Sequence, residues 1–96
     1  MSHGYAQDRK KILNRLRRIE GQVRGIERMV EDDRYCIDIL TQVGATITAL
    51  ESVGLKVLED HTRHCVAAAL ASGDETEAQA KTEELLAAVQ RFSKAR

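Results

Sequence analysis

The sequence predicts an all-α protein with three helices, because its aliphatic residues recur at helical spacing and it contains no proline. In 96 residues there are two Tyr, one Phe and no Trp, so the apolar residues are mainly Leu, Ile, Val and Ala. A small helical bundle that is poor in aromatic residues often completes its core by oligomerising. We expect one domain, residues 1–96, with residues 1–6 as a flexible N-terminal tail.

The first helix is predicted from about Gln7 to Glu31. Its aliphatic residues alternate spacings of four and three, which places them on one stripe. The helix should stop in a polar turn, Glu31-Asp32-Asp33-Arg34. The stripe consists of Ile12, Leu16, Ile19, Val23, Ile26 and Val30.

The second helix is predicted to begin near Asp33–Tyr35 and to continue to Ala71. Gly44 and Gly54 each weaken it by about 1 kcal/mol relative to Ala, but neither has the neighbours that end a helix. It should form a long antiparallel hairpin with the first helix. Its apolar seam consists of Leu40, Val43, Ile47, Leu50, Val57 and His61.

A short third helix is predicted from about Glu75 to Phe92. Gly73 supplies the C-cap of the helix before it, and Asp74 supplies the N-cap of the helix after it. Glu77 stands three residues after Asp74, as in a capping box. We expect this helix to bury Ala78, Leu85, Leu86, Val89 and Phe92.

The sequence contains no signal peptide and no apolar run near the roughly 18 residues of a membrane span. It therefore predicts a cytosolic protein with no membrane partner. In that reducing compartment, the two cysteines are more often metal-binding or reactive than linked in a disulfide. The net charge is zero, but eight Lys and Arg residues gather between Arg9 and Arg28, and acidic residues offset them later in the chain.

His61 and Cys65 are four residues apart, so both project from one face of a helix. Such a pair alone often has only a structural role, as a buried Cys beside a His whose hydrogen bonds are made within the protein. Cys36 changes this interpretation: it precedes His61 by 25 residues, roughly 37 Å along a straight helix. Two antiparallel copies of the helix bring Cys36 of one chain beside His61 and Cys65 of the other. The pattern therefore predicts a symmetric dimer with two equivalent metal sites.

Two thiolates and one imidazole form a soft ligand set that suits Cu(I), whereas Zn(II) prefers four ligands. A cysteine enzyme is not predicted, because no clear carboxylate or amide orients His61 and no Gly-rich oxyanion loop is present.

Three segments resemble the copper-sensitive operon repressor (CsoR) family: RRIEGQVRGI at 17–26, YCIDIL at 35–40 and HTRHC at 61–65. The resemblance covers nearly the whole chain. It implies a three-helix protomer, a dimer with a four-helix core, and a tetramer made of two dimers. It also implies that Cys36 of one chain binds Cu(I) together with His61 and Cys65 of the other, and that Tyr35 and Glu84 surround His61.

Family members that sense nickel or cobalt add a histidine near the N-terminus and use His at other ligand positions. Because this chain contains His3 and His64, a nickel- or cobalt-sensing repressor is an alternative. His64 is rotated about 100° from Cys65 on a helix, so it should point away from the site. The formaldehyde- and sulfide-responsive branches lack the full Cys–His–Cys set that this chain carries.

Four basic residues of the first helix fall within one arc of about 40° on its outward side. A basic row is often only a solvated face. Gly21 and Gly25 lie near the arc, however, and two glycines on an exposed helix face favour close approach of a partner. Basic side chains around such a surface suit the DNA phosphate backbone. The predicted DNA-binding residues are Lys10, Arg15, Arg17, Arg18, Arg24 and Arg28.

The expected function is a repressor that binds operator DNA when metal-free and is released by Cu(I), so that copper efflux or sequestration genes are expressed. Family resemblance assigns Arg15 a role at the operator, whereas a second basic position of the family is Ser52 here. No helix-turn-helix is apparent. The alternatives from other classes are a cytosolic copper-buffering protein and a plain helical interaction module.

Overall fold

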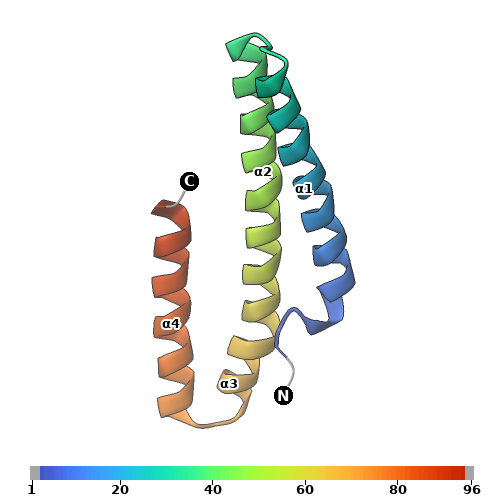
Figure 1. The fold of residues 1–96 in the computed structure, drawn as a ribbon. Coiled ribbons are helices and arrows are strands. Elements are labelled where there is room, and N and C mark those ends of the chain that lie inside the picture. The colour runs from blue at the N-terminus through green and yellow to red at the C-terminus, as the bar shows by residue number, and fades with distance from the viewer. Residues whose placement is uncertain (1–2, 95–96) are drawn as a thin grey trace. The chain divides into compact units, whose positions relative to one another are not determined.

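The computed structural model describes residues 3–94, and its helices follow one another along the chain in the order shown in Figure 1. A short 3-10 turn, η1 (Ala6–Asp8), precedes α1 (Arg9–Glu31). The long second helix consists of α2 (Cys36–Asp60), the π-helical turn η2 (His61–Val66) and α3 (Ala67–Ala71), and α4 (Glu75–Lys94) follows it. The predicted all-α, three-helix protomer is therefore confirmed, with the first helix starting two residues later than expected.

The described chain divides into two compact units, one formed by residues 9–53 and the other by the described residues before and after that range. In the first unit, α1 packs against the first part of α2. Ile12 and Ile19 of α1 are buried together with Val53 of α2. Leu16 and Ala49 pack against this cluster, which gives the hairpin its small core.

The turn between α1 and α2 is a Schellman motif built without glycine. The Arg34 amide donates to the Met29 carbonyl at 2.9 Å, and the Asp33 amide donates to the Val30 carbonyl at 3.2 Å. This pattern requires a left-handed residue at Asp33, which has a φ of 55°. Asp tolerates that conformation better than most residues because its short polar side chain can bond locally.

Only part of the seam predicted for α2 lies on the face that packs against α1. The packed positions are Ile39, Val43, Thr46, Ala49 and Val53, whereas Leu40, Ile47 and Leu50 of the predicted seam are exposed in the protomer. Each of these three exposed residues follows a packed residue directly, so they lie about 100° round the helix from the packed face. Helix α2 therefore carries two apolar faces, and the protomer covers only one of them.

The second unit contains the end of the long helix and α4. Gly73 has a φ of 79°, and the Asp74 carboxylate accepts hydrogen bonds from the amides of Thr76 and Glu77. Both predicted caps are confirmed. The Asp74 amide donates to the Ser72 hydroxyl at 3.2 Å, which takes the place of the return bond that a Glu77 side chain makes in a full capping box.

Helix α4 packs through a narrower face than the sequence predicts. Ala78, Leu85 and Phe92 are partly buried as expected, and the Phe92 ring lies where a Cβ on Gly54 would come within 2.7 Å of it. The burial predicted for Leu86 and Val89 is wrong in the protomer, since they are 60% and 37% exposed. They lie about 100° round the helix from the packed stripe.

The structure differs from two predictions, one about the N-terminal residues and one about the apolar length of the second helix. Of the predicted tail, residues 1–2 lie outside the described residues, while residues 3–6 form a turn and the start of η1. The helical stretch Cys36–Ala71 is long and apolar enough, by length and composition alone, to cross a membrane. Polar residues interrupt the apolar ones in this stretch, but between Ile39 and Ser52 only Glu51 is charged.

Candidate metal centre and nucleic-acid interface

Two of the three predicted metal ligands, His61 and Cys65, lie on the π turn η2, and both are partly buried. Hydrogen bonds of a π turn run from residue i to i+5, so residues four apart stay close to one face. The Thr62 hydroxyl donates to the Leu58 carbonyl at 2.9 Å just before the turn. Thr41, Thr46 and Thr48 make the same bond within regular α-helix, so this bond alone does not explain the π turn. The sequence predicted a regular α-helix here.

Helix α4 brings Glu84, one of the predicted neighbours of His61, to the imidazole. The His61 Nε2 atom lies 3.7 Å from Glu84 Oε1, and Lys81 Nζ lies 3.8 Å from the same oxygen. The first distance is longer than a direct hydrogen bond. The Glu84 side chain is more than half exposed.

The segment before α1 lies against the same turn. A Cβ on Gly4 would come within 2.7 Å of the Asp60 carbonyl oxygen and 3.1 Å of Cys65 Sγ. Only glycine permits this approach. His3, exposed, stacks on Tyr5 with ring centroids 5.7 Å apart. The sequence of residues 1–6 predicts a flexible tail and gives no sign of this contact.

Asp60 is the most deeply buried charged residue in the described range, at 2% exposed. Lys56 Nζ lies 3.3 Å from Asp60 Oδ1 and 3.1 Å from Asp8 Oδ2, so one ammonium joins two carboxylates. Hydrogen bonds first to Asp8 and then to Asp60 raise the pKa of Lys56 above its ordinary value. The other oxygen of Asp60, Oδ2, is buried without a hydrogen-bond partner.

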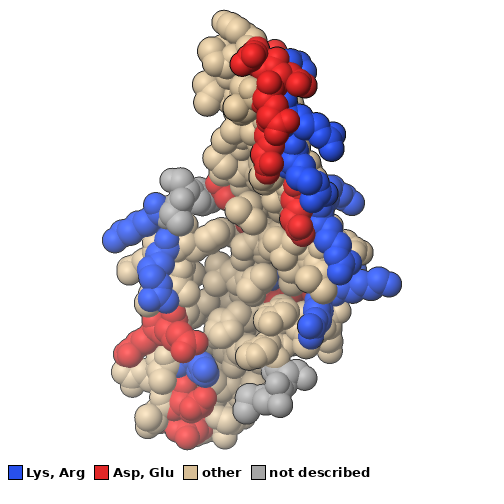
Figure 2. Space-filling view, viewed as in Figure 1, with Lys and Arg blue, Asp and Glu red and all other residues tan. Residues whose placement is uncertain are grey.

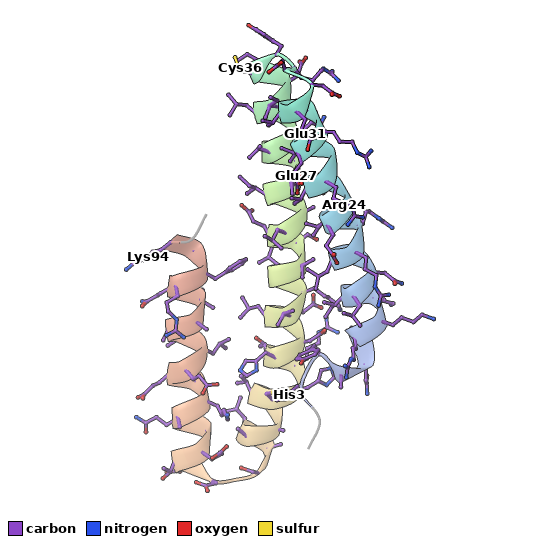
Figure 3. The ribbon with its side chains drawn as sticks, in the orientation of Figure 1. His3, Arg24, Glu27, Glu31, Cys36 and Lys94 are labelled. Carbon is purple, nitrogen blue, oxygen red and sulfur yellow. The ribbon has the colours of Figure 1, made fainter. Side chains whose placement is uncertain are left out.

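Cys36, the third predicted ligand, is the first residue of α2 and is exposed. Figure 3 shows its sulfur at the tip of the hairpin. Tyr35, which precedes it, caps α2 through its carbonyl, which accepts the amides of Asp38 and Ile39 at 3.0 and 3.2 Å. Within residues 3–94 of one protomer, no group of three or more His, Cys, Asp or Glu side chains is arranged to hold a metal ion. His64 is exposed on η2.

The predicted DNA-binding residues all lie on α1 and are all exposed. Figure 2 shows them as a basic row along the helix, beside an acidic row. The acidic row contains Glu27 and Glu31, and Figure 3 shows Arg24 extending outward from the same helix. Helix α1 therefore presents adjoining stripes of opposite charge, and the basic one is the candidate nucleic-acid interface. It consists of Lys10, Arg15, Arg17, Arg18, Arg24 and Arg28.

The two glycines of α1 have no role in packing the protomer. A Cβ on Gly25 would meet nothing within 4 Å, and a Cβ on Gly21 would meet only the Arg24 guanidinium at 3.8 Å. Their cost to the helix is therefore not offset within this unit. Gly25 also lines a hollow of about 290 Å³ between α1 and α2.

Comparisons with known proteins show the family to which this chain is similar. Residues 8–91 match the family described as metal-sensitive transcriptional repressor. The copper-sensing transcriptional repressor CsoR of Bacillus subtilis is 50% identical over 94 residues, which cover 98% of this chain and 90% of that protein. RicR, a copper-sensing transcriptional repressor of Mycobacterium tuberculosis, is 56% identical over 72 residues, 75% of each chain.

Two solved structures share the fold. The copper-sensing repressor CsoR with Cu(I) from Geobacillus thermodenitrificans superposes with a TM-score of 0.83 at 46% identity, covering 91% of this chain and 88% of that one. The nickel-responsive transcriptional regulator InrS superposes with a TM-score of 0.75 at 40% identity, covering 86% and 90%. This family consists of transcriptional repressors and not of enzymes. Because both the family match and the relatives span most of its length, the chain belongs to the CsoR family of metal-sensitive transcriptional repressors.

Proposed function

We propose that this chain is an intracellular, copper-sensing transcriptional repressor that binds operator DNA when metal-free and releases it on binding Cu(I). The observation that carries the proposal is the donor set: an imidazole and a thiol on η2, and a second, exposed thiol at the start of α2. The high identity to copper-sensing repressors over most of the chain supports it. The whole chain acts as one metal-sensing, DNA-binding domain.

The ligands of Cu(I) are Cys36, His61 and Cys65. Two thiolates and one imidazole match the soft, low-coordinate preference of Cu(I). The Nε2 atom of His61 faces Glu84, which leaves Nδ1 as the nitrogen for the metal. A carboxylate on the other ring nitrogen fixes the tautomer and orientation of a ligating imidazole. Tyr35, beside Cys36, and Glu84 complete the surroundings of the site.

The site is shared between protomers. One protomer gathers no group of three donors within residues 3–94, and the exposed thiol of Cys36 is available to a second chain. The uncovered face of α2, with Leu40, Ile47 and Leu50 exposed, supplies the apolar surface for that association. A homodimer with two equivalent sites follows, and two dimers form the tetramer. This use of the apolar face also accounts for the membrane-like composition of α2.

The basic row on α1 contacts the operator. Arg and Lys side chains on one helix face neutralise phosphates and gain affinity through counterion release. Gly21 and Gly25, which no packing within the protomer explains, allow the helix surface to approach the DNA backbone closely. The operator, rather than a membrane, is therefore the proposed partner.

A nickel- or cobalt-sensing repressor is the second candidate. It is favoured by the 40% identity to the nickel-responsive InrS and by the position of His3 next to Gly4, which lies against Cys65. Nickel prefers more nitrogen ligands and a higher coordination number than Cu(I). His3 and His64 are the residues that could supply such nitrogens.

Titration of the reduced protein with Cu(I), Ni(II) and Zn(II), each followed by anisotropy of a labelled DNA fragment from upstream of its gene, tests the proposal. We expect tight Cu(I) binding at one metal per protomer and release of DNA by Cu(I) alone. Release by Ni(II) alone supports the second candidate. Copper binding without any specific DNA binding identifies a copper buffer and contradicts the repressor.

A further inference from the structure

The hollow of about 290 Å³ between α1 and the start of α2 lies inside the unit formed by residues 9–53. Three of its lining side chains form hydrogen bonds readily: Gln22 on α1, Arg34 in the turn after α1, and Gln42 on α2. The other described residues that line it are Gly25, Ile26 and Met29, so none of them is acidic. Arg34 therefore gives the hollow a positive charge, which favours an anionic occupant.

The three polar side chains of the hollow have no partner in the protomer. Within residues 3–94, the side chains of Gln22, Arg34 and Gln42 make no hydrogen bond or ion pair, and all three are exposed. The backbone of Arg34 is nevertheless fixed, because its amide donates to the Met29 carbonyl in the turn. The hairpin thus holds two side-chain amides and a guanidinium around one hollow, with their N–H donors available to a ligand.

Gly25 leaves the hollow open on the side of α1. Glycine inside a helix lowers helix stability relative to alanine. A Cβ at Gly25 would meet nothing within 4 Å, so the packing of the protomer does not require a glycine there. A longer side chain at this position would occupy space that a bound group can use. The glycine is therefore better explained by a bound group than by the fold.

A row of cations on α1 leads to the hollow. Lys11, Arg15, Arg18 and Gln22 follow one another at spacings of four, three and four, so they share one side of the helix. All four are exposed. Glu27 lies about 140° round α1 from Gln22, so the acidic row is on another side. An anionic chain that enters the hollow can therefore continue along three basic side chains.

The hollow lies away from the surface that we propose for the dimer. Gln42 is about 160° round α2 from Leu40 and about 140° from Ile47. Those two residues belong to the uncovered apolar face. Association of two protomers through that face leaves Gln42 accessible to DNA.

We propose that this hollow binds a phosphodiester group of the operator backbone. The inference rests on the proposed function and adds a binding site to it. Arg34 supplies the charge, and the amides of Gln22 and Gln42 donate neutral hydrogen bonds to the phosphate oxygens. A concave site between two helices receives the convex DNA backbone and does not enter a groove of the duplex. Such contacts position the protein on the duplex and carry no base readout of their own.

The first test is the double variant Gln22→Met and Gln42→Met, which keeps the size of both side chains and removes their hydrogen bonds. We expect the metal-free protein to bind upstream DNA about tenfold or more weakly, because bonds to a charged group are among the strong ones. The salt dependence of binding should not change, since no charge is removed. Gln90→Met on α4, also an exposed amide, is the control and should bind DNA as wild type.

The second test is Arg34→Gln, which removes the charge of the hollow. The slope of log K against log salt should fall by about 0.9 for each protomer that engages a phosphate. Arg91→Gln on α4 makes the same change at an exposed position outside the hollow and should leave the slope unchanged.

The third test fills the hollow. Gly25→Ala and Gly25→Leu should raise the urea concentration at which the protein unfolds, because both residues favour a helix more than glycine does. They should nevertheless weaken DNA binding, Leu more than Ala. Gly44→Ala is the matched control, since a Cβ there also meets nothing within 4 Å but Gly44 does not line the hollow. It should stabilise the protein and leave DNA binding unchanged. A purely structural role for Gly25 predicts the opposite, a loss of stability in Gly25→Ala.

The outcomes separate this proposal from the proposed function. If wild type binds no upstream DNA or is not released by Cu(I), the proposed function is wrong. If wild type responds to Cu(I) but the Gln22, Gln42, Arg34 and Gly25 variants all bind DNA as wild type, the function stands and the hollow is not part of the interface. Equal loss of affinity for upstream DNA and for a shuffled duplex of the same length supports a phosphate site. Loss confined to upstream DNA contradicts it and indicates base readout. A change in oligomer mass, measured by analytical ultracentrifugation, also contradicts it and identifies the hollow as an interface between copies of the chain.

Discussion

The Nε2 atom of His61 lies 3.7 Å from Oε1 of Glu84, so a ring on η2 faces a carboxylate on α4. These residues are far apart in sequence and meet only because α4 folds back along the long helix. Lys81 approaches the same Glu84 oxygen at 3.8 Å. Glu84 is thus placed between a cation of its own helix and the imidazole. If the proposed role of His61 holds, a change in the direction of the ring should alter its contact with Glu84.

His61→Ala should keep copper binding but lose regulation. Two thiolates remain to hold Cu(I), whereas the contact with Glu84 disappears. We expect DNA affinity to change less than twofold on adding Cu(I), measured by anisotropy with copper-loaded protein. Glu83→Gln, one residue from Glu84, serves as a control for general damage to α4. A His61→Ala protein that still released DNA fully on copper addition would falsify this role.

Mixing two inactive variants tests the shared site. Cys36→Ala and Cys65→Ala should each lose the copper response and keep DNA binding. Heterodimers of the two carry one intact site and one site without either thiol. Since random exchange makes half of the dimers heterodimers, about a quarter of the wild-type Cu(I) sites should return. Copper titration before and after subunit exchange measures this, and no recovery after verified exchange would indicate a site within one chain.

The sequence predicted helices and caps well, because spacing, Gly73 and Asp74 act locally. It predicted the buried faces less well. Periodicity shows that Leu40 or Leu86 is apolar on a helix, but not which neighbouring face a single protomer covers. Helix α2 has two such faces, and the residues predicted for its seam belong largely to the uncovered one.

In the candidate site, too, the residue types can be read from the sequence, whereas the packing contacts cannot. The residue types and spacing of His61, Cys65 and Cys36 suggest a metal site, and these three ligands stay a prediction. The contacts of Gly4 and Lys56 could not be predicted, because they arise from the return of residues 3–8 onto the long helix. A glycine in a short polar segment gives no sign of what it packs against. The π turn likewise has no local signal in its side-chain bonds, since the Thr62 bond also occurs at Thr41 and Thr46 in regular α-helix.

Asp33→Gly should stabilise the protein. Asp33 has a φ of 55° in the turn between α1 and α2, where glycine has no Cβ to clash. Relief of left-handed strain should raise the free energy of unfolding by about 1 kcal/mol, measured in urea. Asp33→Val should lower it, because a β-branched residue resists positive φ. Equal stabilities for the two variants would show that the turn relaxes to another conformation.

Replacing Arg17 and Arg24 together with Ala should weaken DNA binding and flatten its salt dependence. Both are exposed on the basic row of α1, where each phosphate contact releases counterions. Each lost contact should lower the slope of log K against log salt by about 0.9. Cu(I) affinity should hardly change. Arg91→Ala on α4 is the control, and an unchanged slope in the double variant would place the DNA on another surface.

Bound DNA should weaken the binding of Cu(I) to the wild type. Coupling between two binding sites is reciprocal, so the factor by which Cu(I) weakens DNA binding equals the factor by which DNA weakens Cu(I) binding. Couplings of this kind are typically about 1–3 kcal/mol, or roughly 5- to 150-fold. Competition of the protein with a Cu(I) chelator, with and without saturating operator, measures the second factor directly. A mutated operator of the same length controls for non-specific electrostatics. If the chelator removes copper equally well in all cases, Cu(I) is a bound metal but not the inducer.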